Sequence, residues 1–155
     1  MIRVLFLCLG NICRSPMAEA VFKQQVERAG LSHQIEIDSA GLGDWHAGER
    51  PHRGTIEILT RHGIPHDWMR SRQIQKADIR DFDYIVAMDE ENISGLRKLG
   101  ATDPQQVFRL LDLVDDAHTK NVPDPWYTGN FDEVYDLVTR GCDRLLDKIK
   151  REHSF

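Results

Sequence analysis

The sequence predicts an α/β fold in which a parallel sheet is covered by helices on both faces. Apolar runs typical of buried strands alternate along the chain with amphipathic stretches typical of helices, and this alternation favours a parallel sheet. The 155 residues have the length of one domain. No internal repeat, low-complexity tract or linker divides them, so we expect a single domain over residues 1–155.

The first thirty residues predict a strand, a tight loop and a helix. Residues 3–8 form a continuous apolar run, RVLFLC, which ends near Gly10-Asn11 and indicates a buried strand. Ser15 is predicted to cap the helix that follows, with Pro16 at its first position. Gly30 is predicted to end that helix.

The remaining elements continue the alternation. The runs at 35–40, 82–88 and 107–111 predict three further strands, and the stretches at 55–62, 90–99 and 130–151 predict helices. Residues 41–53 and 114–129 are polar or rich in glycine and proline, so they predict loops. We expect Trp68 and Phe108 to belong to the core, and Cys142 to be a packed thiol of the last helix.

The charge balance excludes some functions. The chain has 20 Lys plus Arg and 25 Asp plus Glu, so its formal net charge is 20 − 25 = −5. This charge favours neither nucleic-acid nor membrane-surface binding, and an anionic substrate would need a local positive site. Three cysteines do not make a disulfide framework, and the apolar start is too short for a secretory signal. We therefore expect a cytoplasmic protein.

The strongest functional signal is the segment Cys8-Leu9-Gly10-Asn11-Ile12-Cys13-Arg14-Ser15, between the first strand and the first helix. A loop at this place can point its backbone N–H groups inward and form an anion site, to which the helix N-terminus adds partial positive charge. Arg14 supplies a planar fork for two phosphate oxygens. Gly10 and Asn11 tolerate the left-handed backbone angles that a tight cradle requires. The segment therefore predicts a phosphate-binding loop.

Cys8 is the candidate nucleophile of this loop. The helix terminus and Arg14 both favour its thiolate, which is the form that attacks phosphorus. A lone strand cysteine is more often simply buried, but its combination with Arg14 and Ser15 favours catalysis. A P-loop nucleotide site would need a lysine before Ser15, and a zinc site would need more cysteine or histidine near Cys8 and Cys13. We expect neither of these sites, and no metal.

Asp124 is the candidate proton donor. It lies between Pro123 and Pro125, beside Trp126, in the predicted loop 114–129. An alkoxide or phenoxide leaving group needs a proton, and a carboxylic acid on a stiff backbone can supply it. Asp-Pro is also a common turn pair, and by itself the segment favours a plain turn.

Taken together, the two segments resemble the low-molecular-weight protein tyrosine phosphatase family. The resemblance rests on Cys-x-Gly-Asn-x-Cys-Arg-Ser-Pro near the N-terminus and Asp-Pro-aromatic-Tyr near the C-terminus. It extends over essentially the whole chain, through Ser39-Ala40-Gly41, Trp45-His46, His62-Gly63-Ile64, Arg72-Gln73 and residues 82–89. It implies a four-stranded parallel twisted sheet with helices on both faces and the phosphate-binding loop between the first strand and the first helix.

The resemblance also implies a role for each matching residue. Cys8 forms a phosphocysteine, Arg14 binds the phosphate, and Asp124 is first the general acid and then the general base. Side-chain hydrogen bonds that support the loop come from Asn11, Ser15 and Ser39. The cleft for a flat phosphorylated ring is walled by Trp45, Trp126 and Tyr127. The implied substrates are phosphotyrosine proteins or peptides, the implied inhibitors are phosphate-like oxyanions, and we expect a monomer that needs no cofactor.

The sequence departs from the family pattern at two places. Met69 stands where family members often carry a histidine that is tied into the loop network, and His66 is nearby but out of register. Residues 52–54 read His-Arg-Gly where the family often has Asp-x-Arg. Neither departure touches the reacting groups. His46, beside Trp45, is expected to be a solvated loop histidine.

Other functions on the same fold stay open as alternatives. An arsenate reductase typically needs further cysteines in a mobile middle segment, and none lies between Cys13 and Cys142. A phosphoarginine phosphatase carries a small threonine where this chain has Ile12. A non-catalytic phosphate binder would be expected to lack the nucleophile or the acid. Cys8 and Cys13 flank a tight loop, so a regulatory disulfide and simple packing of Cys13 are both open.

Overall fold

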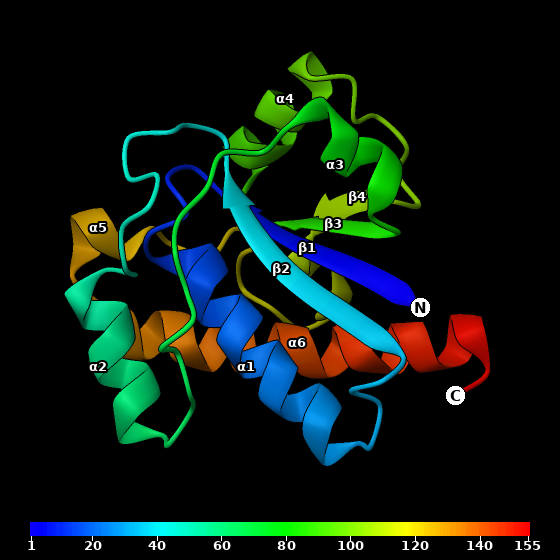
Figure 1. Cartoon of the computed structure of the whole chain (residues 1–155), viewed down its shortest axis with the longest axis horizontal. Coiled ribbons are helices and arrows are strands. Elements are labelled where there is room, and N and C mark those ends of the chain that lie inside the picture. The colour runs from blue at the N-terminus through cyan, green and yellow to red at the C-terminus, as the bar shows by residue number, and fades with distance from the viewer.

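The computed structural model describes residues 1–155 and contains four strands and seven helical segments (Figure 1). In chain order these are β1 (Ile2–Cys8), α1 (Arg14–Arg28), β2 (Ile35–Gly41), α2 (Arg53–Arg61), α3 (Lys76–Asp81), β3 (Tyr84–Ala87), α4 (Glu90–Lys98), β4 (Val107–Arg109), the 3₁₀ helix η1 (Leu110–Leu113), α5 (Pro125–Thr128) and α6 (Phe131–His153). None of the helices is both long and apolar enough to cross a membrane.

The four strands form one parallel sheet in the order β2-β1-β3-β4. β1 pairs with β2 from Ile2 opposite Ile35 to Cys8 opposite Gly41, and with β3 on its other side. This confirms the predicted α/β fold with a four-stranded parallel sheet. Because the chain passes from β1 to β2 on one side and to β3 on the other, a crevice opens at the C-terminal end of β1.

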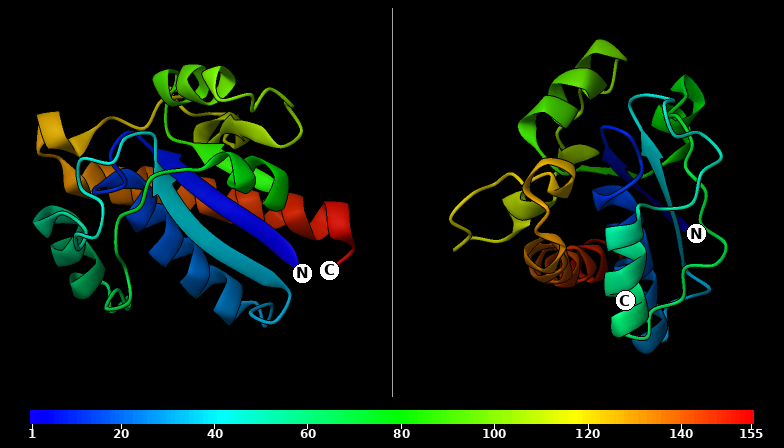
Figure 2. Two further views of the ribbon diagram at one scale, coloured as in Figure 1. Left: turned by 45° about the horizontal axis from the view of Figure 1, so that its top comes forward. Right: turned by 90° about the vertical axis from the view of Figure 1, so that its left-hand side faces the viewer.

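Helices cover both faces of the sheet, which explains why the strands are apolar without alternation. Val4, Phe6 and Cys8 of β1 belong to the larger core cluster, which includes residues of α1 and α6. Leu5 and Leu7 point to the opposite face, into a smaller cluster with residues of α4 and Ile79 of α3 packed against it. Figure 2 shows α1 and α6 on one side of the sheet and α3 and α4 on the other.

Several local predictions were wrong. Ser15 does not cap α1, and Pro16 is its third residue and not its first, because the cap position is Cys13 and the helix already begins at Arg14. The Ser15 hydroxyl is used inside the loop. Trp68 is 43% exposed and is not a core residue, since its ring lies under the Lys23 ammonium on the surface of α1. Phe108 is only partly buried against the core, whereas Cys142 is fully buried as predicted.

Short helices account for the other differences. α3 was not predicted, and α5 lies inside the predicted loop 114–129. The predicted strand 107–111 ends at Arg109 and continues as the single turn of η1. α2 begins two residues earlier than predicted, at Arg53, because the His52 ring accepts a hydrogen bond from Gly54 N at 2.9 Å and caps the helix. With six and four residues, α3 and α5 are too short to repeat an apolar face over two turns, so no apolar pattern indicated them.

Candidate active site

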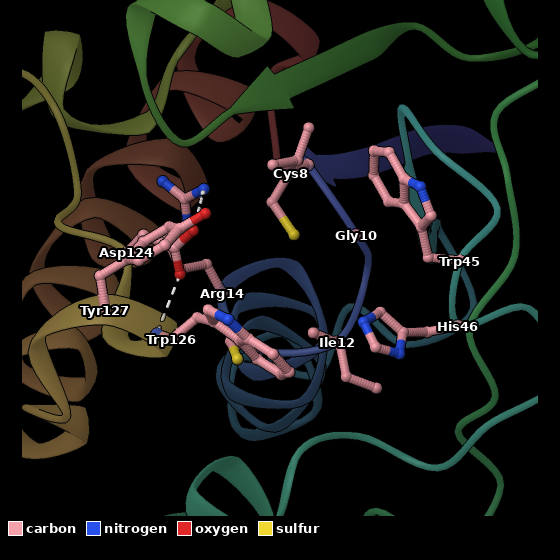
Figure 3. Close-up of a pocket in the computed structure, with 11 residues that line it drawn as sticks. Cys8, Gly10, Ile12, Arg14, Trp45, His46, Asp124, Trp126 and Tyr127 are labelled. Carbon is pink, nitrogen blue, oxygen red and sulfur yellow. Dashed lines mark hydrogen bonds and ion pairs between the residues drawn. The ribbon is translucent and has the colours of Figure 1, made fainter.

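A cavity lies at the C-terminal end of β1, where the crevice of the sheet opens (Figure 3). Its walls come from three separate segments of the chain: the β1–α1 loop, the loop after β2, and the segment that begins α5. The lining residues are Cys8, Leu9, Gly10, Ile12, Cys13, Arg14, Trp45, His46, Asp124, Trp126 and Tyr127. The fold thus brings together nearly all the residues that the sequence indicated for phosphate, proton transfer and cleft walls.

The β1–α1 loop offers free backbone donors to this cavity. None of the backbone N–H groups of residues 9–13 donates a hydrogen bond to another backbone group. Asn11 holds the loop's one left-handed backbone conformation, with φ of 54°, and its side chain is buried. The free N–H groups and the N-terminus of α1 together form an electropositive concavity that suits an anion with several oxygens.

Cys8 is buried at the end of β1, and its sulfur points into the cavity (Figure 3). The Ser15 hydroxyl lies 3.0 Å from that sulfur. Ser15 Oγ also accepts a hydrogen bond from Asn11 Nδ2 at 2.8 Å. Because this acceptor position is taken, the hydroxyl proton of Ser15 is free to point at the sulfur, where it stabilises a thiolate.

Residues outside the cavity orient the Asn11 amide and so fix the direction of its hydrogen bonds. Arg72 N donates to Asn11 Oδ1 at 3.0 Å, which fixes the amide so that Nδ2 faces the two serines. Ser39 Oγ accepts from Asn11 Nδ2 at 3.0 Å and donates its proton to Glu19 at 2.5 Å. The donors therefore run from Arg72 N through the Asn11 amide and Ser39 and end at the Glu19 carboxylate. Ser15 accepts from the same amide, and its own proton can go to the Cys8 sulfur at 3.0 Å or to the carbonyl of Ala40 at 3.5 Å.

Glu19 was not identified from the sequence, although it is a buried carboxylate one helical turn after Ser15. Burial raises its pKa, and the hydrogen bond from Ser39 opposes this shift. Trp68 Nε1 donates to its other oxygen at 3.3 Å. Trp68 is thus partly exposed, while its indole N–H supplies a second hydrogen-bond partner for the buried Glu19 carboxylate.

Arg14 enters the cavity from the first turn of α1 and is held from the opposite side. Its Nη1 donates to Asp89 at 2.6 Å and to the carbonyl of Val122 at 3.0 Å, and its Nη2 lies 3.5 Å from Asp124 Oδ2. Burial by itself lowers the pKa of this guanidinium, but Cys8, Asp89 and Asp124 raise it by more, so Arg14 stays charged. Its fork is therefore oriented before any anion binds.

Asp89 is a second functional residue that sequence reasoning missed. It follows β3, at the same edge of the sheet as the end of β1, and it also caps α4 by accepting from Asn92 N at 2.8 Å. The signal that could have found it was its position: an acidic residue directly after a buried strand that neighbours the phosphate loop.

Asp124 faces the loop from α5, which it caps. Its Oδ1 accepts from Trp126 N at 3.0 Å, while its Oδ2 is turned toward Arg14. The side chain is 24% exposed, so solvent reaches it. Figure 3 shows its carboxylate across the cavity from the Cys8 sulfur, which is the side from which a leaving group would depart.

Aromatic side chains form the mouth of the cavity and remain free for a ligand. They are exposed to 65% at Trp45, 53% at Trp126 and 79% at Tyr127. His46 lies among them, with its ring 5.7 Å from that of Trp126 and its Nδ1 3.0 Å from Glu49. The expectation of a solvated loop histidine was wrong, because packing against Trp126 makes His46 part of the cavity wall. A planar ring would fit between these walls.

The chain is similar to known proteins over nearly all of its length. Residues 3–154 match the family described as low molecular weight phosphotyrosine protein phosphatase. The low molecular weight protein-tyrosine-phosphatase YfkJ of Bacillus subtilis is 54% identical over 98% of both chains, and PtpA of Staphylococcus aureus is 45% identical over 98% of this chain and 96% of its own.

Solved structures agree with the sequence comparison. The crystal structure of YfkJ superimposes with a TM-score of 0.95, covering 98% of this chain and 96% of its own. The crystal structure of DARP, a Drosophila arginine phosphatase, has a TM-score of 0.88 at 33% identity, covering 96% of this chain and 98% of its own. The similarity thus includes two kinds of phosphatase named for different phosphorylated residues.

Proposed function

Because the chain belongs to the low molecular weight phosphotyrosine protein phosphatase family, we propose that it hydrolyses phosphotyrosine in proteins or peptides through a phosphocysteine intermediate. The observation that best supports this proposal is that Cys8, Arg14 and Asp124 line the same cavity, together with aromatic side chains. One phosphatase domain spans residues 1–155 in this proposal. The enzyme acts as a cytoplasmic monomer, and phosphate-like oxyanions inhibit it by occupying the loop.

In the first step, the free N–H groups of residues 9–13 and the Arg14 guanidinium bind the phosphate oxygens. The Cys8 thiolate attacks phosphorus in line with the bond to the tyrosine oxygen. That P–O bond breaks as the S–P bond forms, and Asp124 gives its proton to the departing phenolic oxygen. The Arg14 fork and the N–H groups stabilise the charge on the equatorial oxygens.

In the second step, water attacks phosphorus from the side that the phenol has left. The Asp124 carboxylate accepts a proton from this water, the S–P bond breaks, and inorganic phosphate forms. The Cys8 thiolate is the leaving group, and the hydroxyl of Ser15 stabilises the negative charge that returns to sulfur. Asp89 stays bound to Arg14 in both steps and keeps the guanidinium in register.

The preference for one kind of phosphorylated residue depends on the aromatic side chains at the mouth of the cavity and on Ile12. Ile12 lines the cavity with a branched apolar side chain. In the phosphatases of this family that act on phosphoarginine, a smaller threonine is typical at this position. The rings of Trp126 and Tyr127 provide flat apolar surface for a phenyl group. These contacts favour an aromatic phosphomonoester over a guanidinium phosphoramidate.

The test is a comparison of turnover on matched peptides that carry phosphotyrosine, phosphoserine or phosphoarginine at the same position. We expect the highest kcat/KM for phosphotyrosine and no turnover of any peptide by Cys8→Ser. A higher kcat/KM for phosphoarginine would assign the chain to the other kind of phosphatase. Vigorous hydrolysis by Cys8→Ser would contradict the covalent mechanism.

A further inference from the structure

The carbonyl groups of the phosphate-binding loop pose a physical problem of their own. A loop that turns its N–H groups toward an anion must turn its C=O groups the other way, into the protein. Asn11, Ile12 and Cys13 are all buried, so their carbonyls cannot rely on water. A buried carbonyl without a donor costs free energy comparable to a lost hydrogen bond, and the loop would relax by rotating its peptide planes.

Some of the donors to these carbonyls are backbone groups. Leu42 N and Gly43 N donate to the carbonyls of Cys8 and Leu9, each at 3.0 Å, where the chain leaves β2. His52 N donates to the carbonyl of Ile12 at 2.7 Å. These bonds do not depend on which side chain stands at the donor position.

Two further donors are hydroxyl groups of side chains, and the carbonyl of Cys13 also accepts a hydrogen bond from Met17 N of α1, at 3.4 Å. Ser71 Oγ donates to the carbonyl of Asn11 at 2.5 Å, and Thr55 Oγ1 donates to the carbonyl of Cys13 at 3.0 Å. Thr55 is fully buried and Ser71 is 6% exposed. Neither residue lines the cavity, so neither can touch a bound phosphate. Both hydroxyls therefore act on the loop from behind.

These two residues lie beside the two departures from the family pattern. Thr55 directly follows the His52-Arg53-Gly54 stretch, and Ser71 is two residues after Met69. The Ser71 bond also acts on the residue that most needs support. Asn11 is in the left-handed conformation, with φ of 54°. Asparagine tolerates this conformation better than most residues, but it persists only where the surroundings hold it.

We propose that Thr55 and Ser71 are positioning residues of the phosphate cradle. Their hydroxyls hold the carbonyls of Cys13 and Asn11 outward, and the peptide N–H groups on the other side of the loop stay aimed at the anion. This inference rests on the proposed phosphatase function, and it adds to that function two residues that support the loop from behind.

The experiment compares variants that remove only the donor. Thr55→Val keeps the shape of the side chain and loses the hydroxyl, and Ser71→Ala loses the hydroxyl of the second donor. Thr139→Val is the matched control, because the Thr139 hydroxyl of α6 is buried without any hydrogen-bond partner. Thr55→Ser is the conservative variant, which keeps the donor and loses a methyl group.

Two readouts report on the cradle. The first is kcat/KM for an aryl phosphate together with the inhibition constant of inorganic phosphate. The second is the ratio of the rate constants with which iodoacetate and iodoacetamide alkylate Cys8. The cradle recruits only the anionic reagent, while the reactivity of the thiolate affects both reagents, so the ratio isolates anion binding by the loop.

We expect Ser71→Ala to lose about tenfold in kcat/KM, because it leaves the buried Asn11 carbonyl without a donor. Thr55→Val should lose less, about threefold, because the Cys13 carbonyl keeps its hydrogen bond from Met17 N. Phosphate inhibition should weaken and the alkylation ratio should fall by a similar factor. Thr139→Val should match the wild type, and Thr55→Ser should recover most of what Thr55→Val loses. Thermal unfolding checks that each variant is folded; if Ser71→Ala is not, Ser71→Cys keeps the volume with a weaker donor.

Wild-type values of the alkylation ratio and of phosphate inhibition in both donor variants would overturn the proposal. So would a Thr55→Ser variant worse than Thr55→Val, since the loss would then follow packing volume. If the wild type hydrolysed no phosphotyrosine, the proposed function would fail, yet the alkylation ratio would still decide whether Thr55 and Ser71 position the loop.

Discussion

At the scale of single residues, Asp124 carries two roles that can be separated. One oxygen caps α5 through Trp126 N, and the other is turned toward Arg14 and the cavity. Asparagine caps a helix about as well as aspartate, but it cannot donate a proton as a carboxylic acid does. The variant Asp124→Asn therefore keeps the local structure and removes the chemistry.

We predict that Asp124→Asn lowers kcat by about 10²–10⁴-fold, the range typical of general acid–base groups. The loss should be smaller for aryl phosphates with good leaving groups, because a nitrophenolate departs without a proton while a tyrosyl phenolate needs one. Measuring kcat over aryl phosphates of graded leaving-group pKa checks this. A flat series near the wild-type rate would show that Asp124-Pro125 is only a turn.

Cys13 is the second residue whose role can be isolated. Burial raises the pKa of its thiol to about 12, with the nearby Cys8 charge adding to the effect, so Cys13 is a neutral thiol at physiological pH. Both cysteines line the same cavity. Peroxide would convert the Cys8 thiolate to a sulfenic acid, and Cys13 would then displace water to form a disulfide.

For this reason we predict that dithiothreitol restores the activity of the peroxide-treated wild type and restores much less in Cys13→Ser, where Cys8 proceeds to the irreversible sulfinic acid. Cys142→Ser is the control, since Cys142 is fully buried in α6. Equal recovery in Cys13→Ser and the wild type would mean that Cys13 only packs beneath the loop.

At the scale of elements, Arg72 clamps β2 to α3. Its guanidinium donates to Asp38 at 3.0 Å and to Asp78 at 3.0 Å. Next to it, Gln73 forms an isolated parallel bridge with Gly41 at the end of β2. The clamp thereby fixes the backbone whose N–H holds the Asn11 amide, and it connects the packing of a short surface helix to the geometry of the loop.

The clamp predicts a specific pH dependence. Burial tends to raise the pKa of Asp78, but hydrogen bonds from Arg72 and Gln75 N lower it by more, and the net shift is downward. A carboxyl group with a lowered folded-state pKa stabilises the fold above its unfolded pKa, about 3.9, and this contribution is lost as pH falls through the folded value. Asp78→Asn should therefore be less stable than the wild type at neutral pH, and the difference should shrink in acid.

Urea unfolding of both proteins between about pH 7 and pH 3 measures this difference. Asp67→Asn, at an exposed aspartate, is the control for a change of net charge. A difference between Asp78→Asn and the wild type that stayed constant down to the lowest pH would show that the effect does not depend on the charge of Asp78.

At the scale of the whole molecule, the site joins parts of the chain that are far apart in sequence. Arg14 of α1 contacts Asp89 after β3 and Val122 before α5. An anion bound at Arg14 and the loop would thus stabilise the folded state without touching most of the core. Ligand bound only to the folded state adds about 2.7 kcal/mol to the free energy of unfolding at 100 times its Kd.

We predict that inorganic phosphate raises the thermal midpoint of the wild type and of Cys8→Ser, because serine leaves the cradle in place. Arg14→Ala should lose this shift together with turnover, and Arg53→Ala, at a position that is 89% exposed, should keep both. Differential scanning calorimetry over a phosphate series provides the measurement. A phosphate-dependent shift that persisted in Arg14→Ala would place the anion elsewhere.

The sequence by itself determined the features that are encoded locally. The apolar run before Cys8 and the Gly10-Asn11 turn determine where the first strand ends and the loop begins, because strand period and turn chemistry act between near neighbours. For this reason the residues of the loop were sufficient to predict that it binds phosphate. The six- and four-residue helices α3 and α5 are shorter than the two helical turns over which an apolar pattern can be recognised, and so the sequence did not reveal them.

Only the tertiary structure decided which distant groups complete the site. Asp89, Glu19, Thr55 and Ser71 are ordinary polar residues in the sequence, and their roles arise because the strand order β2-β1-β3-β4 places several segments around the end of β1. The surroundings of His46 and Trp68 were predicted wrongly for the same reason. A side chain's burial and hydrogen-bond partners depend on the surface that packs against it, and that surface comes from residues that no local pattern links to it.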